Sequence, residues 1–248
     1  MSPIPPSCIS RWTAALLLGV SSCAWAAPAV PLCASEFPPY SGAQLPGQGV
    51  MIELAAQAFK RQGLQASASF MPWARVIKLG EQGACIIVGI WRNEQRDQLY
   101  SYSRPMLRQE LGFFARMGSA PDLRRLQDLR LGVERGSYVS AELQEPGLQI
   151  DLASDQKGNF RKLALGRVDL VFSERATGQF LLAAEPELGR QIEWRAPRLE
   201  FKNAHLAMSK NHPQARAWLD AFDLGLAAMK ADGSYARLLA RASISQAD

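Results

Sequence analysis

Short apolar runs alternate along the chain with segments in which apolar residues recur every three or four positions. Runs of the first kind predict buried strands, and segments of the second kind predict helices that cover them. The predicted strands are 29–34, 66–70, 85–88, 111–115, 131–133, 168–172, 192–194 and 205–208. The predicted helices are 50–61, 72–80, 137–143, 160–166, 177–184, 213–229 and 235–242. The opening order of strand, helix, strand, helix, strand predicts an α/β fold with a parallel sheet.

The stretch 89–106 concentrates arginines, amides and aromatic rings directly after the apolar run 85–88. In open α/β sheets, ligands bind at the carboxyl ends of the strands, so this stretch is a candidate binding edge. We therefore predict that Arg96 is the anion-holding centre of a small-molecule site. The alternative is that Arg96 makes a surface ion pair at the head of a helix, an interaction that contributes little to stability.

Two other predicted strand ends carry candidate side chains. Prolines at 38 and 39 end the first strand and place Phe37 and Tyr40 in the following loop. A Gly-Ser turn after the strand 131–133 points backbone N–H groups and the Ser137 hydroxyl at the start of a helix, a usual place to hold an anion. For the two rings, the alternative is packing over the core.

Residues 1–26 differ from the rest of the chain. They hold one charge, an apolar run at 12–20 and small residues that end at Ala26. This arrangement predicts a secretory signal peptide that is cleaved after Ala26, and its apolar run is too short for a stable membrane anchor. A second interpretation is a lipoprotein signal, in which Cys23 would be acylated. We predict that the mature chain lies in the periplasm.

Cleavage leaves Cys33 and Cys85 as the cysteines of the mature chain. Two cysteines in an exported protein predict a disulfide, and both precede or begin apolar runs that neighbouring parallel strands could bring together. Two buried free thiols are the alternative. No further metal ligands are spaced around these cysteines, so we predict no metal site.

Composition narrows the class of function. Of the 28 basic residues, the signal segment holds one, which leaves 27 against 23 acidic residues and a charge of about +4. The densest basic patch, at Arg124, Arg125 and Arg130, has no interleaved aromatic rings, so we predict no nucleic-acid partner. The two histidines, His205 and His212, lie near no Ser or Cys nucleophile motif, so a catalytic triad is not predicted.

Taken in order, the segments resemble periplasmic solute-binding proteins of the polar amino-acid type, that is, bacterial extracellular solute-binding proteins of family 3. The segments that carry the resemblance are 37–40, 72–73, 92–96, 102–105, 131–137, 166–169, 208–213 and 229–235. The resemblance covers nearly the whole mature chain. It implies the type II periplasmic binding fold, in which two lobes, each a mainly parallel sheet flanked by helices, are joined by two hinge crossings.

By the layout of that family, lobe 1 would be 27–108 plus 204–248, and lobe 2 would be 109–203. The resemblance implies a monomer without cofactors that closes on a small amino-acid-like solute and delivers it to an inner-membrane ABC permease. One alternative is a sensing component for a membrane receptor. Another is a periplasmic dehydratase on the same fold, with Glu174 as a general acid, although we predict no enzyme activity.

The resemblance also implies roles for particular residues. Arg96 would grip the ligand α-carboxylate with its planar fork, and the Ser137 hydroxyl would contact the same group. Glu174 would hold the α-ammonium, at a position where the family usually has an aspartate. Phe37 would stack on the ligand side chain. Trp73 and Tyr40 would lie beside it.

Trp91 departs from the pattern of the family. Amino-acid binders commonly carry a small residue at this position, where it helps to hold the ammonium group. An indole there either shrinks the pocket or supplies an aromatic wall that can meet a cation. This leaves amines, aromatic acids and small peptide-like compounds open as ligands.

Overall fold

The computed structural model describes residues 29–137, 143, 147–242 and 244. The predicted signal segment, Cys23 and most of the predicted helix 137–143 lie outside these residues. The strands are β1 (Val30–Ala34), β2 (Ala66–Phe70), β3 (Ile86–Trp91), β4 (Tyr100–Tyr102), β5 (Leu107–Arg116), β6 (Arg130–Glu134), β7 (Gln149–Ala153), β8 (Leu170–Glu174) and β9 (Ile192–Ser209). They form one sheet in the order β2-β1-β3-β9-β5-β8-β6-β7, with β4 also paired to β9.

Helices flank this sheet. They are α1 (Val50–Arg61), α2 (Trp73–Glu81), α3 (Glu94–Leu99), α4 (Gln156–Ala164), α5 (Arg175–Ala184), α6 (Pro186–Gly189), α7 (Ala215–Ala231) and α8 (Ser234–Arg241), with short 3-10 turns at Pro46–Gln48 and Leu126–Asp128. Among the described residues, none of these helices has the length and apolar character to cross a membrane.

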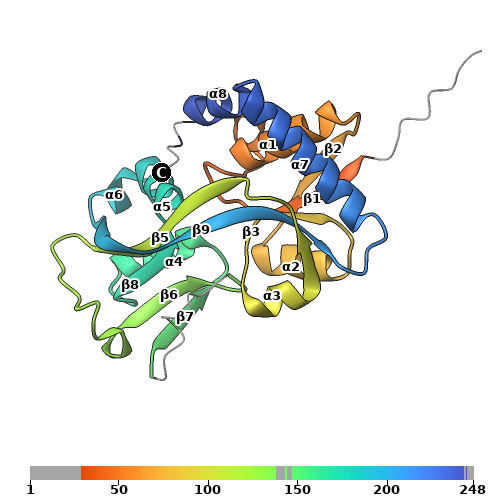
Figure 1. The fold of residues 1–248 in the computed structure, drawn as a ribbon. Coiled ribbons are helices and arrows are strands. Elements are labelled where there is room, and N and C mark those ends of the chain that lie inside the picture. The colour runs from red at the N-terminus through yellow and green to blue at the C-terminus, as the bar shows by residue number, and fades with distance from the viewer. Residues whose placement is uncertain (1–28, 138–142, 144–146, 243, 245–248) are drawn as a thin grey trace, which may run out of the picture.

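The elements gather into two lobes on either side of the long strands β5 and β9 (Figure 1). Lobe 1 contains β1 to β4 with α1, α2, α3, α7 and α8, and lobe 2 contains β6 to β8 with α4, α5 and α6. The predicted α/β class and two-lobed fold are confirmed. Neighbours among β1, β2 and β3, and among β6, β7 and β8, are parallel as predicted, whereas every pair that involves β5 or β9 is antiparallel.

Most predicted elements within the described residues are confirmed with shifted ends. Two predicted strands are wrong in their extent, because both belong to β9. The separate strands predicted at 192–194 and 205–208 are the two ends of one strand of 18 residues. Its middle is polar and only partly buried, so no apolar run marks it. Its structure comes from pairing with β5, from Leu107 opposite Ala204 to Arg116 opposite Ile192.

The apolar pattern of the sequence also did not predict β7, α3, β4 and α6. Strand β7 lies at the edge of the sheet, and four of its five residues are exposed or half-buried, so it lacks the burial that produces an apolar run. Helix α3 has six residues with one apolar side chain, Leu99. It is set by the Asn93 side chain, which accepts a hydrogen bond from the Arg96 N–H as an N-cap.

The hydrophobic core of lobe 1 includes a close contact between two helices. Helices α1 and α7 pack together, with the Phe59 ring 5.9 Å from the Phe222 ring. Close approach of the two helices requires Gly225, because a Cβ there would lie 2.1 Å from the Ala58 carbonyl oxygen. Both rings are fully buried, so this contact anchors α7 on α1.

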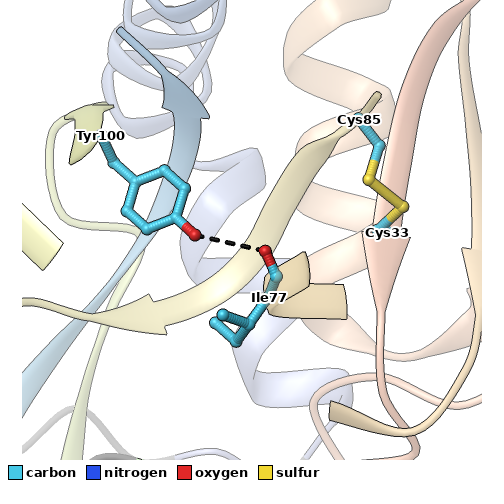
Figure 2. Close-up of a disulfide and its surroundings, with 4 residues drawn as sticks. All are labelled: Cys33, Ile77, Cys85 and Tyr100. Carbon is cyan, nitrogen blue, oxygen red and sulfur yellow. Dashed lines mark hydrogen bonds between the residues drawn. A yellow bond between two sulfur atoms is a disulfide. The ribbon is translucent and has the colours of Figure 1, made fainter. Parts of the chain in front are cut away.

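The predicted disulfide between Cys33 and Cys85 is present (Figure 2). Cys33 lies in β1 and Cys85 directly precedes β3, and the two Cα atoms are 5.8 Å apart. Beside it, the hydroxyl of the buried Tyr100 donates to the Ile77 carbonyl of α2 at 3.3 Å. The cross-link and this hydrogen bond tie β1, β3, β4 and α2 together on one face of lobe 1.

Replacing both Cys33 and Cys85 with serine should lower the free energy of unfolding by about 2–4 kcal/mol. The cross-link spans 52 positions, so its loss frees a long loop in the unfolded chain. Urea unfolding of the mature protein measures this change. The reduced wild-type protein should match the double variant, and an unchanged unfolding midpoint would contradict the expected contribution.

Candidate ligand-binding site

A small cleft lies between the lobes at the carboxyl ends of β1, β3 and β6. Its lining residues come from lobe 1 (Ser35, Phe37, Ser41, Met51, Trp73, Val88, Gly89 and Trp91) and from lobe 2 (Glu134, Ser137 and Gln156). The cleft has a volume of about 40 Å³. One water needs about 10–15 Å³, so this space holds only a few water molecules.

Arg96 is buried next to this cleft, with 9% of its surface exposed. Its Nη1 donates to the Trp91 carbonyl at 2.8 Å within lobe 1, and its Nη2 donates to the Gly136 carbonyl at 3.0 Å in lobe 2. The guanidinium carbon lies 5.9 Å from the centre of the Trp73 ring. The cation is therefore placed between the lobes, rather than on an exposed face.

The Gly136 carbonyl receives a second donor from lobe 1. The indole Nε1 of Trp73 donates to it at 2.9 Å. Gly136 has a φ of +76°, a conformation that glycine adopts without strain, in the turn closed by a hydrogen bond from the Ser137 N–H to the Glu134 carbonyl. This turn holds Ser137, a predicted ligand contact, in the wall of the cleft.

Tyr40 and Glu174 make another contact between the lobes. The Tyr40 hydroxyl donates to Glu174 Oε1 at 3.1 Å, and both residues are 2% exposed. Glu174 Oε2 accepts from the Thr177 N–H at 2.7 Å and so caps α5. Burial raises the pKa of Glu174, and the hydrogen bonds that its carboxylate accepts act in the opposite direction.

Neither Tyr40 nor Glu174 is among the described residues that line the cleft. The structure thus brings Phe37, Trp73, Trp91 and Ser137 into the lining and places Arg96 at its edge. The structure places the Tyr40–Glu174 pair outside the lining of the cleft. The ligand roles of all these residues stay predictions.

Aromatic rings form much of the lobe 1 wall. Phe37 stacks on Tyr40, with ring centres 5.6 Å apart, and meets Trp91 edge-on at 6.0 Å. The indole Nε1 of Trp91 donates to Gln109 Oε1 at 2.7 Å. The hydrogen-bonding group of Trp91 is thus engaged with β5, and its ring supplies an apolar wall.

Sequence reasoning missed two polar residues of lobe 2 that line the cleft, Glu134 and Gln156. Burial first, and then repulsion by Asp155, raise the pKa of Glu134 from 4.5 to about 7. Glu134 directly follows the predicted strand 131–133, so its place at a strand end was a usable signal. Gln156 gave no such signal, because the predicted helix began four residues after the observed start of α4.

Glu134→Gln should change how stability depends on pH. Because folding raises the pKa of Glu134, protonation of this group stabilises the fold below about pH 4.5, and this contribution is lost as the pH rises to about 7. The glutamine of the variant does not titrate, so the variant does not lose this stability as the pH rises. The difference in the free energy of unfolding between variant and wild type should therefore shift in favour of the variant from pH 4 to pH 8, by on the order of 2 kcal/mol. Urea unfolding at both pH values measures this, and a difference independent of pH would contradict it.

Comparison with known proteins identifies relatives of the chain. Residues 32–242 match the family of bacterial extracellular solute-binding proteins, family 3. The chain is 26% identical over 213 residues to the ABC transporter arginine-binding protein 1 of Escherichia coli (strain K12). This match covers 82% of the chain and 86% of that protein.

Solved structures share the fold. One is a histidine kinase sensor domain with similarity to periplasmic binding proteins, with a TM-score of 0.77, 20% identity, and coverage of 86% of this chain and 95% of that one. Another is the arginine-, lysine-, histidine-binding protein of Geobacillus stearothermophilus, with a TM-score of 0.75, 16% identity, and coverage of 89% and 97%. At these identities the likeness shows the fold alone.

The family match spans most of the chain, and the fold and the cleft between the lobes agree with it. The resemblance predicted from the ordered segments is confirmed. The chain belongs to the bacterial extracellular solute-binding proteins, family 3.

Proposed function

We propose that this protein binds a small amino-acid-like solute between its lobes, in the periplasm, and delivers it to the inner-membrane permease of an ABC transporter. In this proposal it acts as a monomer and releases its ligand chemically unchanged. The observation that carries the proposal is the buried Arg96 guanidinium, which reaches backbone acceptors of both lobes at the edge of the cleft.

Arg96 donates to two neutral carbonyl groups, those of Trp91 and Gly136. A carboxylate accepts shorter and stronger hydrogen bonds from a guanidinium, and it can accept two in parallel. Ser137 follows directly on Gly136 and lines the cleft, so its hydroxyl is placed to contact the same carboxylate. A ligand held by both groups would favour the closed state.

Of the remaining predicted residues, some line the cleft, and Tyr40 and Glu174 join the lobes by a hydrogen bond. Phe37, Trp73 and Trp91 offer aromatic surface to the apolar part of a solute. Each Glu174 oxygen already accepts one hydrogen bond, Oε1 from the Tyr40 hydroxyl and Oε2 from the N-terminus of α5. In our proposal, an ammonium group would use a remaining lone pair of this carboxylate or displace the Tyr40 hydroxyl.

We propose that the hinge crossings lie at 108/109 and 203/204, with lobe 1 formed by 27–108 plus 204–248 and lobe 2 by 109–203. Arg108 and Asn203 are direct partners in the ladder of β5 and β9. The two crossings therefore lie side by side on neighbouring strands, which supports a common axis for closure.

The relatives support this assignment. The Escherichia coli relative is an arginine-binding protein of an ABC transporter, and the Geobacillus stearothermophilus structure is a binding protein for arginine, lysine and histidine. A sensing role is the second candidate, since a histidine kinase sensor domain has the same fold.

Arg96→Ala should abolish the thermal stabilisation that amino acids and related acids give to the wild-type protein. The variant loses the cation that would pair with the ligand carboxylate and also the two hydrogen bonds to Trp91 and Gly136. Differential scanning fluorimetry against a panel of amino acids measures the ligand-dependent shift in melting temperature.

Arg92→Ala is the matched control, because Arg92 pairs with Asp97 on the surface and is not among the lining residues of the cleft. This variant should keep the ligand response. A full response in the Arg96 variant would refute its assignment. Recovery of the ligand unaltered after incubation separates binding from enzymatic conversion.

A further inference from the structure

One part of the cleft wall presents hydrogen-bond acceptors to a ligand. Glu134, at the end of β6, and Gln156, at the start of α4, both line the cleft from lobe 2. Gln156 Oε1 is buried and has no hydrogen-bond partner among the described residues. The charged group that acts on Glu134 there is Asp155, which is also negative.

The buried Gln156 oxygen has no donor, and the half-buried Glu134 carboxylate in the same lining is a further acceptor. A buried carbonyl or carboxylate oxygen without a partner costs free energy, and a positively charged N–H group offsets that cost most effectively. The neighbouring Trp73 ring belongs to the same lining, and the Arg96 guanidinium lies 5.9 Å from its centre. The wall around Glu134 is therefore complementary to a cation.

Glu174, the carboxylate that the family resemblance implies for the ligand ammonium group, lies in a different environment from Glu134. Its two oxygens accept hydrogen bonds from the Tyr40 hydroxyl and the Thr177 N–H, and it lies outside the lining of the cleft. Glu134 is a lining residue, and no described basic side chain forms an ion pair with it in this structure. Glu134 is thus the better placed carboxylate to meet a ligand.

We propose that Glu134 and Gln156 form a cation subsite that binds an ammonium or guanidinium group of the ligand. This inference rests on the proposed function and adds the charge class of the solute. The same turn carries Glu134 and Ser137, and Ser137 directly follows Gly136, whose carbonyl accepts a hydrogen bond from Arg96. The ligand is therefore dipolar, with its anion toward Arg96 and its cation toward Glu134.

The subsite depends on pH because Glu134 must be ionised to hold a cation. Burial and Asp155 raise its pKa to about 7. The elements packed against β6 carry further charged groups: Glu174 at the end of β8, the Asp151–Lys162 pair that joins β7 and α4, and Lys157 and Arg161 of α4, which pair with Glu185. Affinity for a cationic ligand should therefore rise between pH 6 and pH 8.

Isothermal titration calorimetry with three probes tests the subsite: L-arginine, its neutral isostere L-citrulline, and Nα-acetyl-L-arginine, which lacks the α-ammonium. At pH 8, Glu134→Gln should weaken arginine binding about 10- to 100-fold, as expected when a charged hydrogen bond is lost. Gln156→Leu should weaken it about 3- to 10-fold. The rise in affinity from pH 6 to pH 8 should disappear in the Glu134 variant.

The probes distinguish two sources of the cation. If Glu134 holds the side-chain cation, citrulline binds the wild type weakly and is indifferent to the Glu134 change. If Glu134 holds the α-ammonium, the acetylated probe behaves in that way instead. Glu187→Gln makes the same change on an exposed residue of α6 and should alter no affinity. An unchanged melting temperature without ligand shows that a variant is folded.

Two results would overturn the inference in distinguishable ways. If the wild type binds these probes and Glu134→Gln binds each of them equally well at both pH values, the subsite is refuted while the proposed function stands. If the wild type binds none of the probes and no amino acid of the panel, the proposed function fails, and the subsite fails with it.

Discussion

The antiparallel pairing of β5 with β9 is the interaction on which the rest of the structure depends. β9 also pairs with β3 and β4 of lobe 1, and β5 also pairs with β8 of lobe 2. Both lobes are therefore parts of one hydrogen-bonded sheet. Relative motion of the lobes must twist or bend these two strands, because separating them would break a ladder that runs from Leu107 to Arg116. In the proposed function, the cleft would consequently open and close as a hinge.

In the proposed function, recognition of the solute and closure of the lobes use the same side chains. Trp73 and Arg96 of lobe 1 donate to one carbonyl of lobe 2, at Gly136, and Tyr40 donates to Glu174. Each of these bonds spans the lobes, so each must lengthen or break when the cleft opens. A solute that offers a better acceptor to Arg96 replaces a contact within the protein, and only the difference between the two interactions drives binding.

The sequence was informative where burial and local geometry leave a pattern. Apolar runs located β1, β3, β6 and β8, and the two cysteines located a covalent link, because these features depend on nearby residues. The middle of β9 left no such pattern, since its pairing partner lies more than 80 residues away in the chain. The place of Glu134 in the cleft wall likewise depends on how lobe 2 faces lobe 1. Such a relation between distant segments has no periodic signature in either segment.

The position of the disulfide has a consequence for the cleft itself. Cys33 lies four residues before Phe37, and Cys85 lies six residues before Trp91, so the two cross-linked segments end in rings that contact each other. The covalent bond joins β1 and β3 at one end, and the pair of rings forms part of the cleft lining at the other. The redox state of the two cysteines thereby contributes to the shape of the cleft wall. An oxidising compartment would fix the spacing of these two segments.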